Sequence, residues 1–513
     1  MTRRATAQPS RFRSRVSEAT TLWYAADYTQ CLRLLEREPP SAQRFFLAAK
    51  ALYRLQRPDA ALVQLTRGES SFVDPAMRAC AYALSAVLHQ MQGRGNQARA
   101  CIHRVHDAWP GAAPPAEVTL LLALWAWLSD DLEQAQRLLE AADVAGDLEA
   151  AAHAASLFAR IHASRREYHA AAILLTDALR LAYSLSVPDL GLIAELLQAL
   201  SQRCGELHLP EALALVSHIH EQMTWSGDLR LHEFLTLRYL AWANALYGES
   251  IAAMRRIHRA ISLVPNPAWQ VPAQLDQARI AFASGEVLTG QALLLDAYER
   301  AKRVDWSAAP GEEGPALLLA AELFAPFDTA RARRLLDRYA IYKAQMSLSL
   351  GVVHDSGLEA MEAYTEAIVL FCSNQVAPSR RPARRAFDAF AAMNYDWRAA
   401  RCAALLYRSG AGERWRQAAQ GRILHYPHSC IAVELRCYGE VVRDDAQARL
   451  SLRQREILQL LRAGDSIDAV ATRLGLSRNT IRVHITKIHR AFGVRNRVEL
   501  LRKTAALDSN RRA

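Results

Sequence analysis

The 513-residue chain lacks the features of a secreted, a membrane-spanning or a P-loop protein. Its eight cysteines form no CxxC pair, and a chain of this length does not need disulfide staples, so we expect reduced, mostly buried thiols. The longest apolar run, residues 118–128, is too short to span a bilayer. No G-x-x-x-x-G-K-[ST] motif occurs, which argues against a P-loop nucleotide site.

The N-terminal residues are basic, but no apolar segment follows them as it would in a secretory signal. Residues 1–20 are polar and rich in arginine, and we expect a disordered tail there. Together with the short apolar runs, this composition predicts a soluble protein of the cytoplasm that contacts no membrane.

No residues have the spacing of a metal site or of a catalytic pair. His103 and His106, like His425 and His428, are three positions apart, but neither pair has an evident third ligand. The Asp and Glu residues belong to amphipathic segments, and none can be assigned as a general acid with its base. We therefore expect no enzyme, no metal and no cofactor. An enzyme hidden in the helical body is the alternative.

Positive charge is concentrated at the C-terminal end. The chain carries 63 Lys and Arg against 52 Asp and Glu, and residues 449–513 hold 15 of the first kind against 5 of the second. The residues before this segment are therefore almost neutral. A nearly neutral body with a small basic segment predicts a polyanionic partner for that segment alone.

Residues 21–420 carry a helical repeat. Apolar residues recur every three or four positions, and strand-like alternation is scarce. An Ala- and Leu-rich helix, a short polar turn and a second helix that opens with a small residue follow one another along the body. The steps between these small residues are 35 to 42 residues, except that the last step would hold two units. The small residues lie near Ala61, Ala98, Ala135, Ala170, Ala212, Ala252, Gly290, Ala332 and Ala399.

A repeat of this period predicts a solenoid of helix pairs. Two short helices cannot bury their apolar faces alone, and small residues at their crossing let the backbones approach. The array resembles tetratricopeptide repeats, although its period exceeds the about 34 residues of that family and the family motif is incomplete. We expect an all-α fold, a tetratricopeptide-like α-solenoid followed by a C-terminal domain of four helices. An irregular helical body without a true repeat is the alternative.

Residues 450–507, the C-terminal domain, contain four short amphipathic segments. Ser451 with Gln454 caps the first, Ser466 caps the second and Ser477 caps the third. Glycines end or separate these segments, and a fourth begins near Asn496. The glycines are Gly464, Gly475 and Gly493.

The third segment of this domain has the pattern of a recognition helix. Its apolar stripe runs through Ile481, Ile485, Ile488 and Phe492. The opposite face carries groups that can meet guanine edges, phosphates and thymine methyls in a major groove. These are Arg482, Val483, Thr486, Lys487 and Arg490. Such a helix on a small helical core predicts a helix-turn-helix that binds double-stranded DNA, with a merely solvated basic face as the alternative.

The C-terminal domain resembles the LuxR-type DNA-binding domains of bacterial regulators. The family pattern appears as LSLRQREIL, GDSIDAVA, LGLSRNTIRVH, AFGV and RVEL, with matching spacing. The resemblance implies that Arg482, Val483 and Thr486 read or touch DNA in the major groove. It also implies that two copies bind inverted half-sites, so we expect a homodimer on DNA.

Phosphate contacts are implied by the same resemblance for Thr480, Lys487 and Arg497. Arg478 and Asn479, at the start of the third segment, complete the set of candidate DNA-binding residues. Departures from the family pattern leave the preferred DNA sequence open. They include Gln454 and Ala469 in place of glutamates and Thr486 where lysine is common.

Two stretches interrupt the repeat pattern, one near the end of the array and one after it. Residues 378–385 are rich in Pro and Arg, and we expect a solvated loop followed by a helix start rather than a second DNA contact. Residues 421–449, broken by Pro427 and Gly439, predict a capping helix and a linker. Residues 508–513 form a short tail.

The favoured interpretation is a bacterial transcription regulator. The helical body would bind a signal, which could be a protein, a peptide or a small-molecule effector, and the C-terminal domain would bind promoter DNA. Large LuxR-type regulators that bind ATP place a P-loop domain before their helical repeats, and no such motif occurs here. The alternative is an interaction scaffold whose DNA-binding domain is weak or vestigial.

Overall fold

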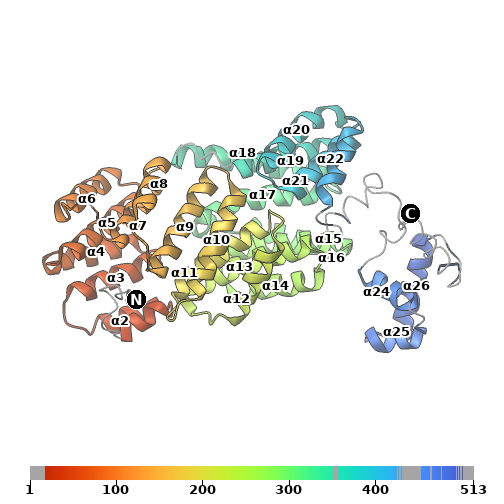
Figure 1. Ribbon diagram of the computed structural model, residues 1–513. Coiled ribbons are helices and arrows are strands. Elements are labelled where there is room, and N and C mark those ends of the chain that lie inside the picture. Colours follow the sequence, from red (N-terminus) through yellow and green to blue (C-terminus); the bar gives the residue numbers. More distant parts are fainter. Residues whose placement is uncertain are drawn as a thin grey trace, which may run out of the picture. The chain divides into compact units, whose positions relative to one another are not determined.

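The computed structural model describes residues 18–111, 113–350, 356–424, 426, 429, 432, 452–462, 465–474, 476–492, 494, 496 and 499–500. Within these residues the regular structure is helical and no strand occurs (Figure 1). The chain divides into two compact units. Unit 1 comprises Met1–Ala243 with His258–Pro265, and unit 2 comprises Asn244–Ile257 with Asn266–Ala513. The prediction of an all-α fold is confirmed.

Unit 1 is a series of antiparallel helix pairs, in which the two helices of a pair pack on each other. The first helices of neighbouring pairs, such as α5, α7 and α9, also pack on one another. Its helices are α1 (Glu18–Tyr24), α2 (Tyr28–Leu35), α3 (Ala42–Arg54), α4 (Pro58–Gly68), α5 (Pro75–Met91), α6 (Gly95–Ala108), α7 (Ala116–Leu128), α8 (Leu132–Ala141), α9 (Leu148–Ser164), α10 (Tyr168–Tyr183), α11 (Leu190–Cys204) and α12 (Pro210–Gln222). Two helices, α13 (Arg230–Leu246) and α14 (Ser250–Leu263), have residues in both units.

Unit 2 continues with the same kind of pair and ends in the C-terminal domain. Its body helices are α15 (Pro267–Ala283), α16 (Val287–Ala301), α17 (Pro310–Phe324), α18 (Thr329–Leu350), α19 (Ser356–Cys372), α20 (Val376–Ala392), α21 (Asp396–Arg408) and α22 (Arg414–Ile423). The C-terminal domain contains α24 (Leu452–Arg462), α25 (Ile467–Leu474) and α26 (Arg478–Phe492).

The turn inside a pair has the same geometry at most positions of the body. After α3, Gln56 adopts a φ of 56° and the Arg57 N–H donates to the Leu52 carbonyl at 2.9 Å. This is the Schellman motif, which closes one helix and redirects the chain into the next. The same left-handed position, two residues before the following helix, is occupied by Ala26, Gly93, Asp130, Arg166, Gly248, Gly285, Asn374 and Asn394.

At most crossings, the fourth residue of the helix after the turn is small and buried. At Gly290 a Cβ atom would lie 2.8 Å from the Phe282 ring of the preceding helix, which shows how closely the helices approach. Two described helices depart from this pattern, α12 with Leu213 and α22 with the exposed Gln417. The other occupants are Cys31, Ala61, Ala98, Ala135, Ala171, Ala253, Ala332, Ser379 and Ala399.

The sequence pattern placed two crossing residues, Ala170 and Ala252, one position too early. Ala171 and Ala253 are fully buried instead. One residue turns a helix by about 100°, so only one of two adjacent alanines can face the partner helix. Ser379 marks the additional unit that the long last step was expected to hold.

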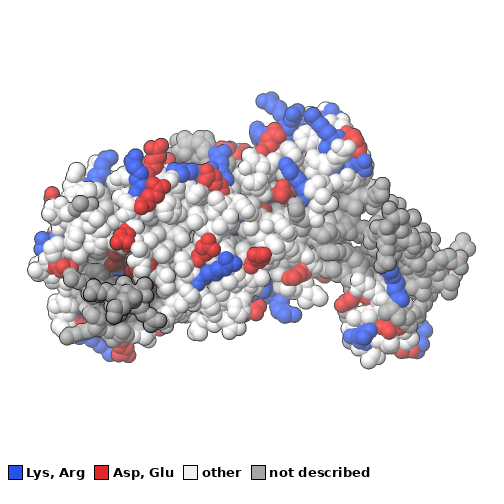
Figure 2. All heavy atoms as spheres, viewed as in Figure 1, with Lys and Arg blue, Asp and Glu red and all other residues white. Residues whose placement is uncertain are grey.

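The loop expected at residues 378–385 is also wrong, because this stretch lies within α20. Pro378 lies in the first turn, where no helical hydrogen bond is lost, and Pro382 is tolerated inside the helix as a buried residue. Figure 2 shows Lys and Arg side chains gathered over α20. Of residues 421–449, the first three end α22, which begins at Arg414, so the capping helix and linker expected there stay a prediction. Pro427, Gly439 and nearly all of the predicted linker lie outside the described residues, as do residues 1–17 and the tail.

The described cysteines are free. Cys372 is half-buried and the others are buried, and burial raises the pKa of the Cys31 thiol to about 12. Cys430 and Cys437 lie outside the described residues. None of the described helices is long and apolar enough to cross a membrane. Among the described residues no group of His, Cys, Asp or Glu could hold a metal ion.

Candidate nucleic-acid interface and a charged network in the body

The described helices of the C-terminal domain pack around one small apolar core. Of the predicted stripe on α26, Ile481 and Ile488 are fully buried, Phe492 is almost fully buried, and Ile485 packs at the edge. The core is completed by residues of α24, α25 and the segment after α26. These are Ile457, Leu458, Leu461, Val470, Ala471 and Leu500.

Side-chain caps determine where the helices of this domain begin. The Ser466 hydroxyl accepts the Ala469 N–H at 3.2 Å, and the Ser477 hydroxyl accepts the Thr480 N–H at 3.1 Å. Both predicted caps are therefore confirmed. Asn496 accepts the N–H of the residue three positions later at 2.9 Å, as expected at the start of a fourth helix. Ser451 and the glycines Gly464, Gly475 and Gly493 lie outside the described residues.

The side of α26 opposite the core is exposed. Arg482 and Thr486 are one helical turn apart, as are Val483 and Lys487, and all of them are exposed. The Val483 side chain is 55 % exposed, which is unusual for a large aliphatic residue without a partner. This face therefore offers cationic donors beside a methyl surface, as major-groove recognition requires.

Local contacts already engage some of the predicted DNA-binding residues. The Arg478 guanidinium lies 3.0 Å from an Asp468 carboxylate oxygen, and both side chains are more than half exposed. The Thr480 hydroxyl lies 2.8 Å from the Ser477 hydroxyl at the cap. The Thr486 hydroxyl donates to the Arg482 carbonyl at 3.0 Å. In this conformation Thr486 therefore presents its methyl group and its oxygen lone pairs.

The structure gives less information on the remaining predicted DNA-binding residues. Asn479 is exposed at the start of α26. Arg490 belongs to α26, but its side chain is not described. Arg497 lies outside the described residues.

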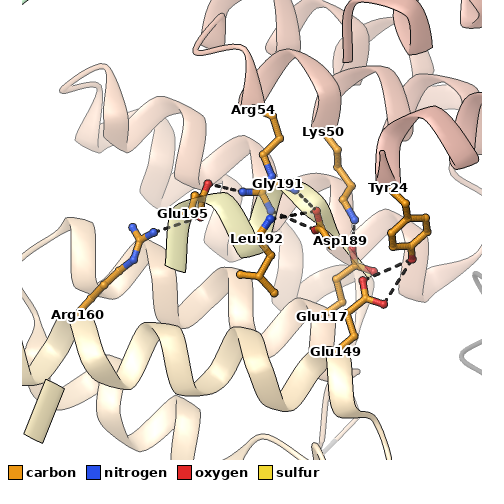
Figure 3. A network of polar contacts seen from close by, with 10 residues as sticks. All are labelled: Tyr24, Lys50, Arg54, Glu117, Glu149, Arg160, Asp189, Gly191, Leu192 and Glu195. Carbon is orange, nitrogen blue, oxygen red and sulfur yellow. Dashed lines mark hydrogen bonds and ion pairs between the residues drawn. The ribbon is translucent and has the colours of Figure 1, made fainter. Parts of the chain in front are cut away.

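Sequence reasoning missed a network of charged side chains within unit 1 (Figure 3). Arg54 of α3 is paired with Glu195 and Asp189, the latter at 3.5 Å, and Arg160 of α9 lies 3.6 Å from the second Glu195 oxygen. Burial alone would raise the pKa of Glu195, but Arg54 and Arg160 lower it to about 2. Glu195 therefore stays ionised between two guanidinium groups.

Asp189 is fully buried beside Arg54 and caps α11. One of its carboxylate oxygens accepts the Gly191 and Leu192 N–H groups at 2.9 and 3.1 Å. A side chain on Gly191 would collide with the Tyr28 hydroxyl, so this glycine is required by a close approach. The cap holds the Asp189 carboxylate where it can pair with Arg54.

A second charged group surrounds Lys50 of α3. Its ammonium lies 3.1 Å from a Glu117 oxygen and 4.6 Å from the centre of a Trp23 ring. The Tyr24 hydroxyl lies 3.4 Å from the Glu149 carboxylate (Figure 3). Burial would lower the pKa of Lys50, but Glu117, together with Glu149 and Tyr24, outweighs burial and raises the pKa, so the ammonium stays charged.

His153 of α9 is the neutral member of this region. Burial, assisted by Arg54, lowers its pKa from 6.5 to about 4. The imidazole is therefore uncharged at neutral pH. No short motif could have revealed this network, because its partners come from helices that are far apart in the sequence.

Comparison with known proteins identifies the C-terminal domain. A family model described as bacterial regulatory proteins, luxR family, matches residues 448–504, which include α24, α25 and α26. No curated protein matches the chain.

Solved structures resemble the helical body at low identity. The apo form of the quorum sensor NprR from B. thuringiensis is 14 % identical, with 71 % of this chain and 97 % of that chain covered and a TM-score of 0.46. The human IFIT1 dimer with PPP-AAAA is 10 % identical over 84 % and 96 % of the chains, with a TM-score of 0.41. The APC/C hetero-tetramer Cut9-Hcn1 is 13 % identical over 94 % and 88 %, with a TM-score of 0.39. Likenesses this distant carry no argument about function.

The family assignment and the packing of the domain agree. The matched residues fold into helices with the predicted caps, buried stripe and exposed basic face. The body before them consists of helix pairs with a repeated turn and a repeated crossing residue. The chain therefore combines a tetratricopeptide-like helical body with a C-terminal helix-turn-helix domain of the LuxR family.

Proposed function

We propose that this chain is a transcriptional regulator that reads promoter DNA with α26 and binds an effector with its helical body. The observation that best supports DNA reading is the exposed face of α26. Arg482, Val483 and Lys487 project from the side of the helix that the core leaves open. A helix held in this way can enter a major groove without unfolding any part of its domain.

Each residue of this face has a role that its chemistry suits. The Arg482 guanidinium can donate two hydrogen bonds to one guanine, and Val483 can contact a thymine methyl group. Thr486 would lie beside them in the groove. Phosphate contacts would come from Arg478, Asn479, Thr480, Lys487, Arg490 and Arg497.

We also propose a homodimer on DNA and a cytoplasmic location in a bacterial cell. A single recognition helix covers only a few base pairs, so two copies related by a twofold axis would read inverted half-sites. A regulator that binds promoter DNA acts in the compartment that holds the chromosome.

Genome-wide capture of DNA fragments by the purified full-length protein tests this proposal. The expected result is a set of peaks that share an inverted repeat and vanish in the double variant Arg482→Ala with Lys487→Ala. Arg334→Ala, which removes an exposed arginine of α18, is the matched control and should leave the peaks unchanged. If neither the full-length protein nor residues 445–513 give peaks that depend on Arg482, the regulator proposal fails and the interaction scaffold is favoured.

A further inference from the structure

A cavity of about 520 Å³ lies within unit 1. Its walls come from α1, α3, α5, α7, α9 and α11, the first helices of successive pairs, together with short connecting segments. The cavity follows from stacking the pairs, because the first helices of neighbouring pairs lie next to one another. Its volume falls in the range of about 300–1,000 Å³ that holds small ligands in proteins.

Most of the cavity wall is apolar, and part of that apolar surface is uncovered. Trp23 and Phe46 are buried in the wall. Leucines of α7 and α9 are only half-buried, so they keep apolar surface that a ligand can remove from water. These leucines are Leu120, Leu121, Leu124 and Leu157.

The charged side chains of the wall balance one another, with three carboxylates against three cations. A fourth carboxylate, that of Asp147, accepts the first N–H groups of α9 and so meets the positive end of that helix. The other carboxylates are Glu117, Glu149 and Glu195, and the cations are Lys50, Arg54 and Arg160.

The charges near α1 are held by contacts within the protein. The Lys50 ammonium lies 3.1 Å from a Glu117 oxygen. The Tyr24 hydroxyl lies 3.4 Å from a Glu149 oxygen, and Glu149 also helps to stabilise the charged form of Lys50 (Figure 3). Among the described residues, this end of the cavity therefore offers neither a free cation nor a free carboxylate.

The charges at the other end of the cavity are paired in the same way. Glu195 lies between Arg54 and Arg160, and Arg54 also contacts Asp189 (Figure 3). A ligand with a net charge would enter a partly dehydrated site whose charges are already matched, which is unfavourable. An uncharged ligand meets no such penalty, so the charge balance favours an uncharged ligand.

Three uncharged polar side chains also line the cavity. They are Tyr53 of α3 with His153 and Ser156 of α9. None of the three makes a hydrogen bond with another residue that the structure describes. Ser156 is only 7 % exposed, so its hydroxyl has little water to contact outside the cavity. Buried polar groups in proteins are nearly always hydrogen-bonded, so a bound molecule is expected to supply the missing partners.

These three groups can bind a polar ligand group without bringing in a charge. His153 and Ser156 are three positions apart and therefore lie on one face of α9. Burial lowers the pKa of His153 to about 4, so its neutral ring donates from one nitrogen and accepts at the other. Burial also raises the pKa of Tyr53, so its phenol stays protonated. Each group can therefore both donate and accept a hydrogen bond.

We propose that this cavity is the effector site and that it takes a small uncharged molecule with an apolar or aromatic body and one polar group, such as an amide. The Tyr53 and Ser156 hydroxyls and the His153 imidazole bind the polar group. The body packs against the half-buried leucines of α7 and α9. The inference rests on the proposed function only in calling the ligand an effector.

Equilibrium dialysis of the full-length protein at pH 7 tests the proposal with probes of one shape. The uncharged probe is 2-naphthamide, its anionic counterpart is 2-naphthoate and its cationic counterpart is 2-naphthamidine. The amide is expected to bind about tenfold more tightly than either ion, or better, because it leaves the charge balance unchanged. Equal or tighter binding of either ion, or no binding of the amide, overturns the proposal.

A variant that removes two hydroxyls tests which groups bind the amide. Tyr53→Phe with Ser156→Ala is expected to weaken 2-naphthamide about threefold to tenfold, because hydrogen bonds are lost. The same variant should leave the binding of 2-isopropylnaphthalene, which has no polar group, unchanged. Tyr183→Phe, at an exposed position of α10 outside the cavity, is the matched control and should affect neither probe. Amide binding that the double variant does not reduce overturns the assignment of these groups.

A second variant locates the binding site. Leu157→Trp fills the apolar part of the cavity and is expected to weaken both the amide and the hydrocarbon. Circular dichroism establishes that each variant is folded before its binding is compared. Unchanged binding of both probes in folded Leu157→Trp overturns the assignment of the cavity.

The outcome is separable from that of the regulator proposal, because the dialysis contains no DNA. Amide binding without promoter binding supports this site and contradicts the regulator. Promoter binding without amide binding contradicts this site alone.

Discussion

Arg482 and Lys487 are exposed on α26, and neither belongs to the core of the C-terminal domain. Truncating such side chains changes the free energy of unfolding by about 0.5 kcal/mol or less. Ile481 and Ile488 of the same helix are fully buried and stabilise the core of the domain. At the scale of residues, the candidate DNA contacts and the stabilising contacts of α26 are therefore separate, which lets their variants be interpreted directly.

Arg482→Ala is expected to weaken binding to the preferred operator by about 1–3 kcal/mol, because a bidentate contact to a base edge is lost. Lys487→Ala is expected to weaken binding to all sequences alike and to reduce the salt dependence of the affinity by about one phosphate contact. Fluorescence anisotropy with operator and scrambled duplexes at several salt concentrations measures both effects. Uniform weakening by Arg482→Ala would show that this residue contacts a phosphate instead.

His153 should make the stability of unit 1 depend on pH. Its pKa is lowered from 6.5 to about 4, so the folded state holds the neutral imidazole. The stabilisation is complete above pH 6.5 and is lost as the pH falls from 6.5 to 4, to a total of about 3 kcal/mol at most. His153→Gln should flatten the free energy of unfolding of unit 1 between pH 6.5 and 4, as followed by hydrogen exchange. An unchanged pH dependence in this variant would contradict the lowered pKa.

At the scale of elements, two local devices build the body. A Schellman turn closes the first helix of a pair, and a small residue at the fourth position of the next helix permits a close crossing. The spacing of small residues predicted the pairs, because helical periodicity is a local property. The choice between adjacent alanines could not be made in the same way, since it depends on how each helix is rotated against its partner.

The corrected crossing residue can be tested with neighbouring alanines. Ala171→Leu should destabilise unit 1 by about 1–3 kcal/mol, because a larger side chain at a fully buried crossing forces the helices apart. Ala170→Leu, at the partly exposed neighbouring position, should leave the free energy of unfolding nearly unchanged. Chemical denaturation followed by circular dichroism compares the two. Equal destabilisation by both substitutions would contradict the crossing geometry.

At the scale of the whole molecule, the net positive charge is concentrated in the C-terminal residues and not spread evenly along the chain. Residues 449–513 hold 15 of the Lys and Arg residues against 5 Asp and Glu, and the body is nearly neutral. The arginines of α20 are an exception in the body, but several have local partners. Arg380 donates to the Ser409 carbonyl at 2.8 Å, and Arg385 lies 3.4 Å from Glu366. We therefore expect α20 to be solvated rather than bound to DNA.

The double variant Arg381→Ala with Arg384→Ala should change the operator affinity of the full-length protein less than twofold, because the phosphate contacts belong to the C-terminal domain. Anisotropy titrations at low and moderate salt measure this. A large loss of affinity, or a smaller salt dependence, would show that α20 takes part in DNA binding.

The helix-turn-helix was predictable from the sequence because its signals are local. Caps at Ser466 and Ser477, the buried stripe of α26 and its basic opposite face all lie within one short segment, and each helix end is determined by residues a few positions away. The repeat of helix pairs followed from the same local periodicity. These features depend on residues that lie close together in the sequence.

The charged cavity was decided by the tertiary structure alone. Lys50 meets Glu117 across 67 residues, and Arg54 meets Asp189 across 135. Each of these side chains has, in its own segment, the surroundings of an ordinary exposed residue of an amphipathic helix. Stacking of the helix pairs buries Arg54 and Asp189, partly covers Lys50 and Glu117, and brings opposite charges together, because the rotation of every helix determines which of its faces turns inward. That rotation depends on packing between segments that are distant in the sequence, so no pattern of neighbouring residues predicts it.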